Sequence, residues 1–175
     1  MRFSVSLHDL DVAEPLAELL PIDQIANLER IDSSVTVIDL ESGICNNPNV
    51  PPFNFSRFAN LESIRIGDDS FENMKEFRIQ GLQNLISLKI GENSFTAEKK
   101  RHGDDPTRSF HVLDCPHLRS IIIGKYSFCD YSGEFEMKNL PALEELKIGD
   151  LNEDSWNFDY ANLVLRGTHF HDGSM

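Results

Sequence analysis

Three residues near the middle of the chain have the chemical types of a hydrolase triad. Ser109, His111 and Asp114 could supply a nucleophile, a base and an orienting acid. However, Ser109 and His111 are two residues apart on one predicted strand, and the chain has no Gly-x-Ser-x-Gly turn to expose a nucleophile. We therefore expect no enzymatic activity from this group.

Residues that can bind metal ions are present, but their spacing does not match a known zinc or calcium motif. Cys115-Pro-His117 lacks the second ligand pair of a structural zinc site. His169 and His171 form a His-x-His sequence that could bind a metal ion adventitiously. The acidic clusters lack calcium-loop spacing and are interpreted as solvated turns: Asp68-Asp69, Asp104-Asp105, and Asp150 with Asp154. We expect neither a metal ion nor another cofactor.

The charge of the chain disfavours two classes of partner. Its 175 residues contain 16 Lys and Arg against 29 Asp and Glu, which gives a formal net charge of −13. Such a surface repels nucleic acids and anionic membrane surfaces. The glycines are spread along the chain and do not form a phosphate-binding loop. The composition therefore favours a protein partner.

The cysteines and the N-terminal residues bear on the cellular location. Cys45, Cys115 and Cys129 are too few for a disulfide framework, although one bridge and one free thiol remain an alternative. Acidic residues interrupt the first twenty positions, so no signal peptide is predicted, and no apolar run has the length of a membrane span. We expect a cytoplasmic protein, or a cell-surface or secreted one if the chain is a fragment. The glycosylation sequon Asn54-Phe55-Ser56 matters only in the second case.

A repeated sequence must position all of these residues. The pattern Leu-x-x-Ile/Leu-x-Ile-Gly begins at Leu61, Leu85, Leu118 and Leu143, and a degenerate copy begins at Val35. The period is 24 to 26 residues, and one copy is longer by about nine residues. A fixed period of this size is typical of a solenoid.

Each copy contains two short segments that alternate as β-strands do. The first ends in the Ile-x-Ile pair and a glycine, for which we predict a positive φ: Gly67, Gly91, Gly124 and Gly149. The second contains a pair of apolar residues: Phe53-Asn-Phe55, Phe77-Arg-Ile79, Phe110-His-Val112, Phe135-Glu-Met137 and Leu163-Val-Leu165. Between the two segments lies a Ser-Phe pair, and the phenylalanines are predicted to form an internal column: Phe71, Phe95 and Phe128.

These segments predict a mainly β repeat protein, a solenoid of about five coils over residues 34–166 with two ladders of short parallel strands. The first ladder is expected at 61–66, 85–90, 118–123 and 143–148, and the second at 77–79, 110–112 and 135–137. The extra residues lie in 96–106, which we interpret as an exposed loop because it is rich in charge, Gly and Pro. Residues 1–33 are predicted to form an N-terminal cap with a strand in 1–7 and short helices in 11–20 and 21–28, and 167–175 a tail.

The repeats resemble leucine-rich repeats, in particular the Phe-containing BspA-like repeats of protist and bacterial proteins. The sequence Leu-x-Ser-Ile-x-Ile-Gly-x-x-Ser-Phe recurs three times almost unchanged, and the resemblance covers residues 33–166. The chain departs from the plant and animal pattern because it has no Asn ladder after the strand and no helix-length outer segment. The resemblance implies a right-handed solenoid and a role in protein–protein recognition or adhesion, and it transfers no catalytic residue.

The outward positions of the first ladder are the main candidate binding site. They are occupied by Asp39, Arg65, Lys89, Ile122 and Lys147. Three cations in a column are unusual on so acidic a chain, although a merely polar surface, neutralised by Glu62, Glu144 and Glu145, remains an alternative. The flanking hydroxyls of Ser63, Ser87 and Ser120 would leave this face approachable to an acidic protein segment.

A second candidate is the basic part of the 96–106 loop, with Lys99, Lys100, Arg101 and His102. Both candidates fit a non-enzymatic protein-binding or adhesion module. The alternative function is a structural subunit that self-associates, or joins a larger complex, through the ends or edges of its solenoid.

Overall fold

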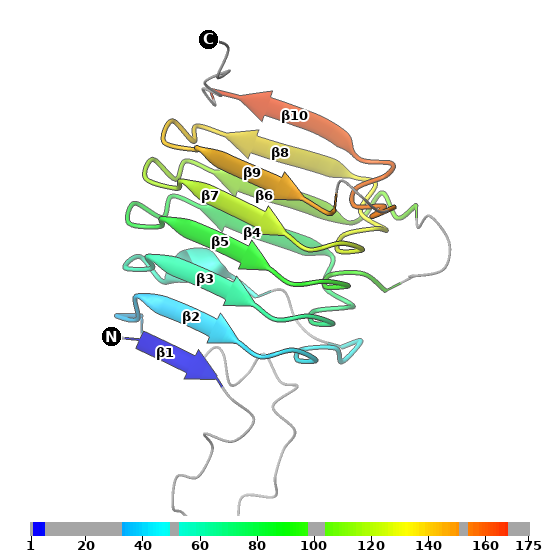
Figure 1. Cartoon of the computed structure of the whole chain (residues 1–175), viewed down its shortest axis with the longest axis horizontal. Helices are drawn as coiled ribbons and strands as arrows, with labels where there is room; N and C mark the ends of the chain where they lie inside the picture. Colours follow the sequence, from blue (N-terminus) through cyan, green and yellow to red (C-terminus); the bar gives the residue numbers. More distant parts are fainter. Residues whose placement is uncertain (1, 6–32, 50–52, 98–103, 151–153, 168–175) are drawn as a thin grey trace, which may run out of the picture.

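The chain winds into a β-solenoid of about five turns, with two parallel sheets on opposite sides of a thin core (Figure 1). The computed structural model describes residues 2–5, 33–49, 53–97, 104–150 and 154–167. The predicted helices at 11–20 and 21–28 lie outside the described residues. Within the described part, no helix is long and apolar enough to cross a membrane.

The first sheet contains the strands that follow the repeat leucines. Its strands, in spatial order, are β1 (Arg2–Val5), β2 (Val37–Leu40), β3 (Ser63–Ile66), β5 (Ser87–Ile90), β7 (Ser120–Ile123) and β9 (Glu145–Ile148). Every pairing is parallel and in register, as the repeat predicts. The repeat strands begin two residues later than predicted, since the buried Leu61, Leu85 and Leu118 belong to the preceding bend. β1 confirms the strand predicted within residues 1–7.

The second sheet contains β4 (Glu76–Gln80), β6 (Ser109–Leu113), β8 (Glu134–Lys138) and β10 (Asn162–Arg166), again all parallel. The prediction of a strand at 53–55 is wrong. Phe55–Arg57 forms a short 3-10 helix, η1, because the Asn54 side chain accepts a hydrogen bond from the backbone N–H of Ser56 (2.9 Å). The Ser56 hydroxyl then accepts one from the N–H of Gln80 (2.8 Å) at the edge strand β4.

Two columns of phenylalanine rings fill the core. In the first, neighbouring rings stack nearly parallel with centroids 4.7 to 5.1 Å apart: Phe71, Phe95, Phe128 and Phe158. The second column stacks in the same way at 5.1 and 4.8 Å: Phe77, Phe110 and Phe135. Rings of opposite columns meet edge to face, as Phe110 and Phe128 do at 5.2 Å. The predicted internal column is confirmed.

A column of buried serines links the turns that follow the first sheet. Ser94 Oγ accepts a hydrogen bond from the N–H of Ser70 (3.2 Å) and donates to the carbonyl of Gly67 (2.9 Å) in the preceding coil. Ser127 repeats this one coil later, accepting from the N–H of Ser94 (2.9 Å) and donating to Gly91 (2.7 Å). The serines therefore satisfy turn backbone groups that the strand ladders leave unpaired.

The glycine prediction is wrong at three of its four positions. Gly149 has a φ of +68°, but Gly67, Gly91 and Gly124 do not lie in the positive-φ region. These glycines are needed because the backbone of the neighbouring coil comes too close for a side chain. A Cβ on Gly124 would lie 2.5 Å from the carbonyl carbon of Gly91 and 2.7 Å from the nitrogen of Glu92.

The left-handed residues occupy other positions of each coil. Among them are the two neighbours of the buried serine in three successive turns: Asp69 and Phe71, Asn93 and Phe95, and Tyr126 and Phe128. A third left-handed residue follows each second-sheet strand: Gly81, Asp114, Asn139 and Gly167. The coil thus reverses direction through non-glycine residues as well as through glycines.

Glycines of these two kinds should differ in how strongly substitution lowers stability. Gly124→Ala should lower the free energy of unfolding by about 3 kcal/mol, because its Cβ would overlap fixed backbone. Gly81→Asn should lower it by only about 1 kcal/mol, the cost of a left-handed backbone for a side chain, because no atom lies within 4 Å of a Cβ there and Asn139 has a positive φ at the equivalent position two coils along. Urea unfolding measures the free energy of unfolding of both variants. Equal losses for the two variants would contradict the explanation by close backbone approach.

Candidate functional site

The predicted row of outward residues lies on the exposed face of the first sheet. Strand register places Asp39, Arg65, Lys89, Ile122 and Lys147 directly beside one another on β2, β3, β5, β7 and β9. Neighbouring strands are about 4.8 Å apart, so Lys89 and Lys147 lie about 10 Å apart with Ile122 between them. The structure therefore brings together the residues that the repeat aligned.

The charges of this row are not equivalent. Arg65 forms an ion pair with Asp39, its neighbour on β2, and this pair offsets the positive charge at that end of the row. Lys89 and Lys147 are exposed, and Ile122 is half-buried. The positive part of the face is consequently the segment from β5 to β9.

A shallow depression of about 330 Å³ lies where β5, β7 and β9 end. Lys89, Ile122 and Lys147 line it together with Lys125, whose ammonium lies 6.0 Å from the centre of the Tyr126 ring. Acidic residues also line it: Asp68, Glu92 and Asp150. The depression thus offers an aliphatic surface between lysines, beside several carboxylates.

The serines of the face bond to their neighbours. The hydroxyls of Ser63 and Ser87 lie 2.9 Å apart, and that of Ser120 donates to Glu145 Oε2 (2.7 Å), which takes the serine's place on β9. These bonds fix the hydroxyls along the row. We therefore regard the serines as support for the lysine row.

Ile86 and Arg119 also belong to this face, although we did not predict them. They line a second depression of about 380 Å³ with Glu62, Asn84 and His117, at the start of the same strands. Ile86 is 47 % exposed. The sequence signal is the position before the repeat serine, where an isoleucine stands in a place that Glu62 and Arg119 fill in other copies.

The basic residues of the predicted loop, Lys99, Lys100, Arg101 and His102, lie outside the described residues. The N-terminal end of the 96–106 segment is not exposed as predicted, whereas Asp104 and Pro106 at the other end are exposed. Thr96 is fully buried; its hydroxyl donates to the carbonyl of Tyr126 (2.8 Å) and accepts from the N–H of Cys129 (3.2 Å). Asp105 forms a parallel bridge with Tyr131.

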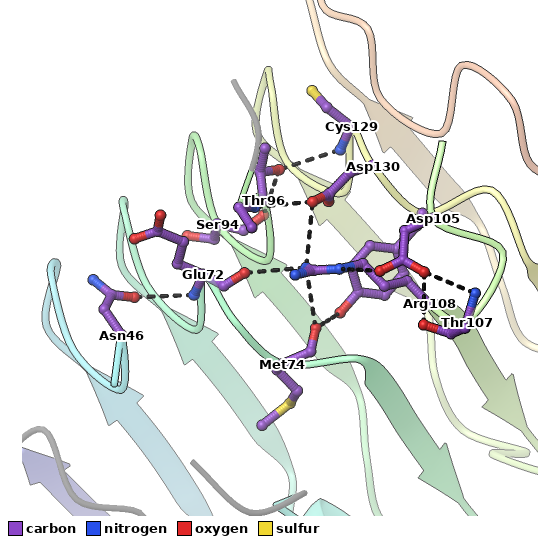
Figure 2. Close-up of polar contacts among 12 residues, drawn as sticks. Asn46, Glu72, Met74, Ser94, Thr96, Asp105, Thr107, Arg108, Cys129 and Asp130 are labelled. Atoms are coloured by element: carbon purple, nitrogen blue, oxygen red, sulfur yellow. Dashed lines mark hydrogen bonds and ion pairs between the residues drawn. The ribbon is translucent and has the colours of Figure 1, made fainter. Parts of the chain in front are cut away.

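Arg108 links Asp105, near the C-terminal end of this segment, to the coils on either side (Figure 2). Its guanidinium, buried with 5 % exposure, contacts Asp105 Oδ2 at 3.3 Å and Asp130 Oδ2 at 3.5 Å. It also donates to the carbonyls of Glu72 (3.1 Å) and Met74 (3.4 Å). A buried arginine with paired charges and satisfied donors is a structural anchor, because removing one partner leaves an uncompensated charge.

The surroundings of this anchor shift two pKa values. Burial raises the pKa of the Tyr131 phenol, which donates to the Met74 carbonyl (2.6 Å). Partial burial opposes ionisation of Asp105, but hydrogen bonds from Thr107 and the nearby charge of Arg108 outweigh it and lower the pKa of Asp105. The Asp105 carboxylate is thus stabilised in its charged form.

The residues considered for chemistry have structural contacts. The Asp114 carboxylate accepts hydrogen bonds from Asn139 (2.6 Å) and Gln80 (3.4 Å), while His111 Nδ1 faces Glu136, so the triad of Ser109, His111 and Asp114 is not assembled. Cys115 is buried, whereas His117 is exposed, with Nδ1 2.6 Å from the carbonyl oxygen of Gln83.

The three cysteines, Cys45, Cys115 and Cys129, are free and buried, so the alternative of one disulfide is not realised. Burial raises the pKa of Cys115, and that of Cys129 to about 11, so both stay protonated at neutral pH. Among the acidic clusters, Asp68 Oδ1 accepts the N–H of Glu92 (2.8 Å) and the N–H of Asp150 donates to Ser155 (2.7 Å). His169 and His171 lie outside the described residues.

The lowered pKa of Asp105 predicts a pH-dependent contribution to stability. Because the folded pKa lies below that of the unfolded chain, the contribution is complete above about pH 3.9 and is lost as the pH falls through the folded value. Asp105→Asn should therefore have a lower melting temperature than the wild type at pH 7. The difference between the two melting temperatures should narrow below about pH 4. Asp104→Asn, an exposed neighbouring control, should follow the wild type throughout. Thermal unfolding between pH 7 and 3 tests this, and a gap that does not change with pH would contradict it.

Comparisons of the chain with protein-family models, with curated proteins and with solved structures find no match. The resemblance to leucine-rich repeats therefore stays a prediction that rests on the repeat sequence alone.

Proposed function

We propose that the chain is a non-enzymatic protein-binding or adhesion module whose first sheet binds an acidic segment of another protein. The observation that carries this proposal is the row of Lys89, Ile122 and Lys147, which lines one depression on a chain of net charge −13. Carboxylates that flank an apolar side chain fit lysines that flank an isoleucine.

The rigidity of the sheet favours binding at this face. The strands are fixed by parallel pairing on both sides of β5 and β7, so their side chains lose little conformational freedom when a partner binds. Charge attraction would mainly raise the rate of association, and its effect would weaken with salt.

Selection from a displayed library of peptides tests the proposed face. Selected peptides should be enriched in Asp and Glu around an aliphatic residue and should bind at least about 10-fold more weakly to Lys89→Glu/Lys147→Glu, which corresponds to about 1.4 kcal/mol. Arg65 is left unchanged because a glutamate there would lie beside Asp39.

The matched control is Lys138→Glu/Arg166→Glu, which changes the charge equally at two exposed, neighbouring positions of the second sheet. This variant should bind like the wild type. If no acidic peptides are selected, or if both double variants lose affinity equally, the first sheet is not the binding face. If the selected peptides bind both double variants as tightly as the wild type, the search moves to the basic loop residues Lys99, Lys100, Arg101 and His102.

A second candidate function is end-to-end assembly through the last coil. β9 and β10 are the outermost described strands of their sheets at this end of the solenoid (Figure 1). The apolar side chains there are unusually exposed: Trp156 at 39 %, Tyr160 at 51 %, Leu163 at 59 % and Leu165 at 40 %. Leu163 and Leu165 occupy the positions that Phe135 and Met137 bury one coil earlier. The apolar side chains of the last described coil are therefore only partly shielded from solvent.

Assembly of this kind predicts concentration-dependent growth. Sedimentation velocity over a wide range of concentrations should show a rising average mass for the wild type, which Leu163→Glu should abolish. Ile86→Glu, an equally apolar exposed position on the first sheet, should assemble like the wild type. A chain that stays monomeric at every concentration would exclude assembly.

A further inference from the structure

The outer face of the second sheet holds a cluster that the sequence analysis divided between separate repeats. His111 on β6 is the register partner of Glu136 on β8. Glu134 lies two residues before Glu136 on the same strand, so its side chain lies on the same face. One imidazole and two carboxylates are thus neighbours across a strand pair.

His111 is unusually buried for a residue on an outer sheet face. It is 7 % exposed, and its Nδ1 has no hydrogen-bond partner among the described residues. Glu136 Oε2 is 3.9 Å away, beyond hydrogen-bond distance. A buried polar nitrogen without a partner is energetically costly, so a missing ligand at this point would explain it.

Arg78 on β4 does not fill this role, although it is the register partner of His111 on the other side. Its guanidinium lies 3.6 Å from Glu76 and donates to Gln80 (3.0 Å), both on its own strand. The side of His111 that faces β8 therefore has the two carboxylates, and Lys138 follows Glu136 on the same face of that strand.

The distances suit a metal ion. One ligand atom each of His111, Glu134 and Glu136 lies within 4.8 Å of the other two. Ligands of a tetrahedral zinc ion, bound at about 2.0–2.1 Å, lie about 3.3 Å apart, so small rotations of the glutamate side chains would close the site. Imidazole favours zinc and similar transition metals over magnesium and calcium, which prefer oxygen ligands.

We propose that His111, Glu134 and Glu136 bind a divalent transition-metal ion, with zinc as the preferred ion and water at the remaining position. His111 Nδ1 supplies the nitrogen ligand, and each carboxylate supplies an oxygen. The ion links β6 to β8 and thereby joins two consecutive coils. It lies on the sheet opposite the proposed protein-binding face, so the two proposals stand or fall separately.

Zinc titration of the full chain tests this site. The background carries His169→Ala and His171→Ala, which removes the His-x-His sequence as a competing ligand. Isothermal titration calorimetry with zinc chloride should show one bound equivalent, and cobalt should give visible d–d absorption bands. Saturating zinc should also raise the melting temperature, because the metal binds the folded state.

Glu134→Gln/Glu136→Gln should weaken zinc binding at least about 10-fold and remove the rise in melting temperature. The matched control is Glu62→Gln/Glu144→Gln, which removes the same charge from exposed positions beside the first sheet and should bind normally. His111→Gln should also lose binding. Because His111 is buried and its substitution can disturb the fold, the glutamate pair decides the test. Absence of zinc binding in the background chain, or equal affinity in both double variants, would overturn the proposal.

Discussion

The spacing of about 4.8 Å between stacked strands is the constraint on which the rest of this solenoid depends. Backbone pairing of successive coils sets that distance, and every buried residue of a coil must fit it. The phenylalanine rings meet it by stacking at 4.7 to 5.1 Å. The buried serines meet it by bonding to the backbone of the coil before. Gly124 meets it by having no side chain where two backbones nearly touch.

The same spacing determines the chemistry of the surface. Outward residues at equivalent repeat positions must lie side by side, so each row has the properties of one repeat position. Arg65 and Lys89, with Lys147 beyond Ile122, give a basic row on the first sheet. A histidine and a glutamate at one equivalent position give a ligand pair on the second. The two faces can therefore differ in charge and in chemistry while sharing one core.

Much of the fold could be predicted from the sequence because the repeat carries it. Alternation within each copy defines the strands, and the shared period requires parallel pairing, so the row from Arg65 to Lys147 follows directly. The role of Gly67, Gly91 and Gly124 could not be predicted, because the atoms that exclude a side chain there belong to the backbone of the preceding coil. Arg108 was missed for a similar reason, since its partners Glu72 and Asp130 are brought to it only by the fold. The facing pair of His111 and Glu136 follows from the same alignment, because each residue lies between the two apolar positions of its second segment.

The left-handed residues in the turns have a consequence for how the chain folds. Among the described residues, eleven that are not glycine have a positive φ, and each costs roughly 1 kcal/mol or more relative to ordinary backbone. A single coil therefore opposes its own formation, and strand pairing, ring stacking and serine bonds to a second coil offset that cost. The folding nucleus must accordingly contain at least two adjacent coils, and further coils then add to an existing surface. The first pairing of two coils is therefore the slow step of folding. The remaining coils then add one after another on either side of that pair.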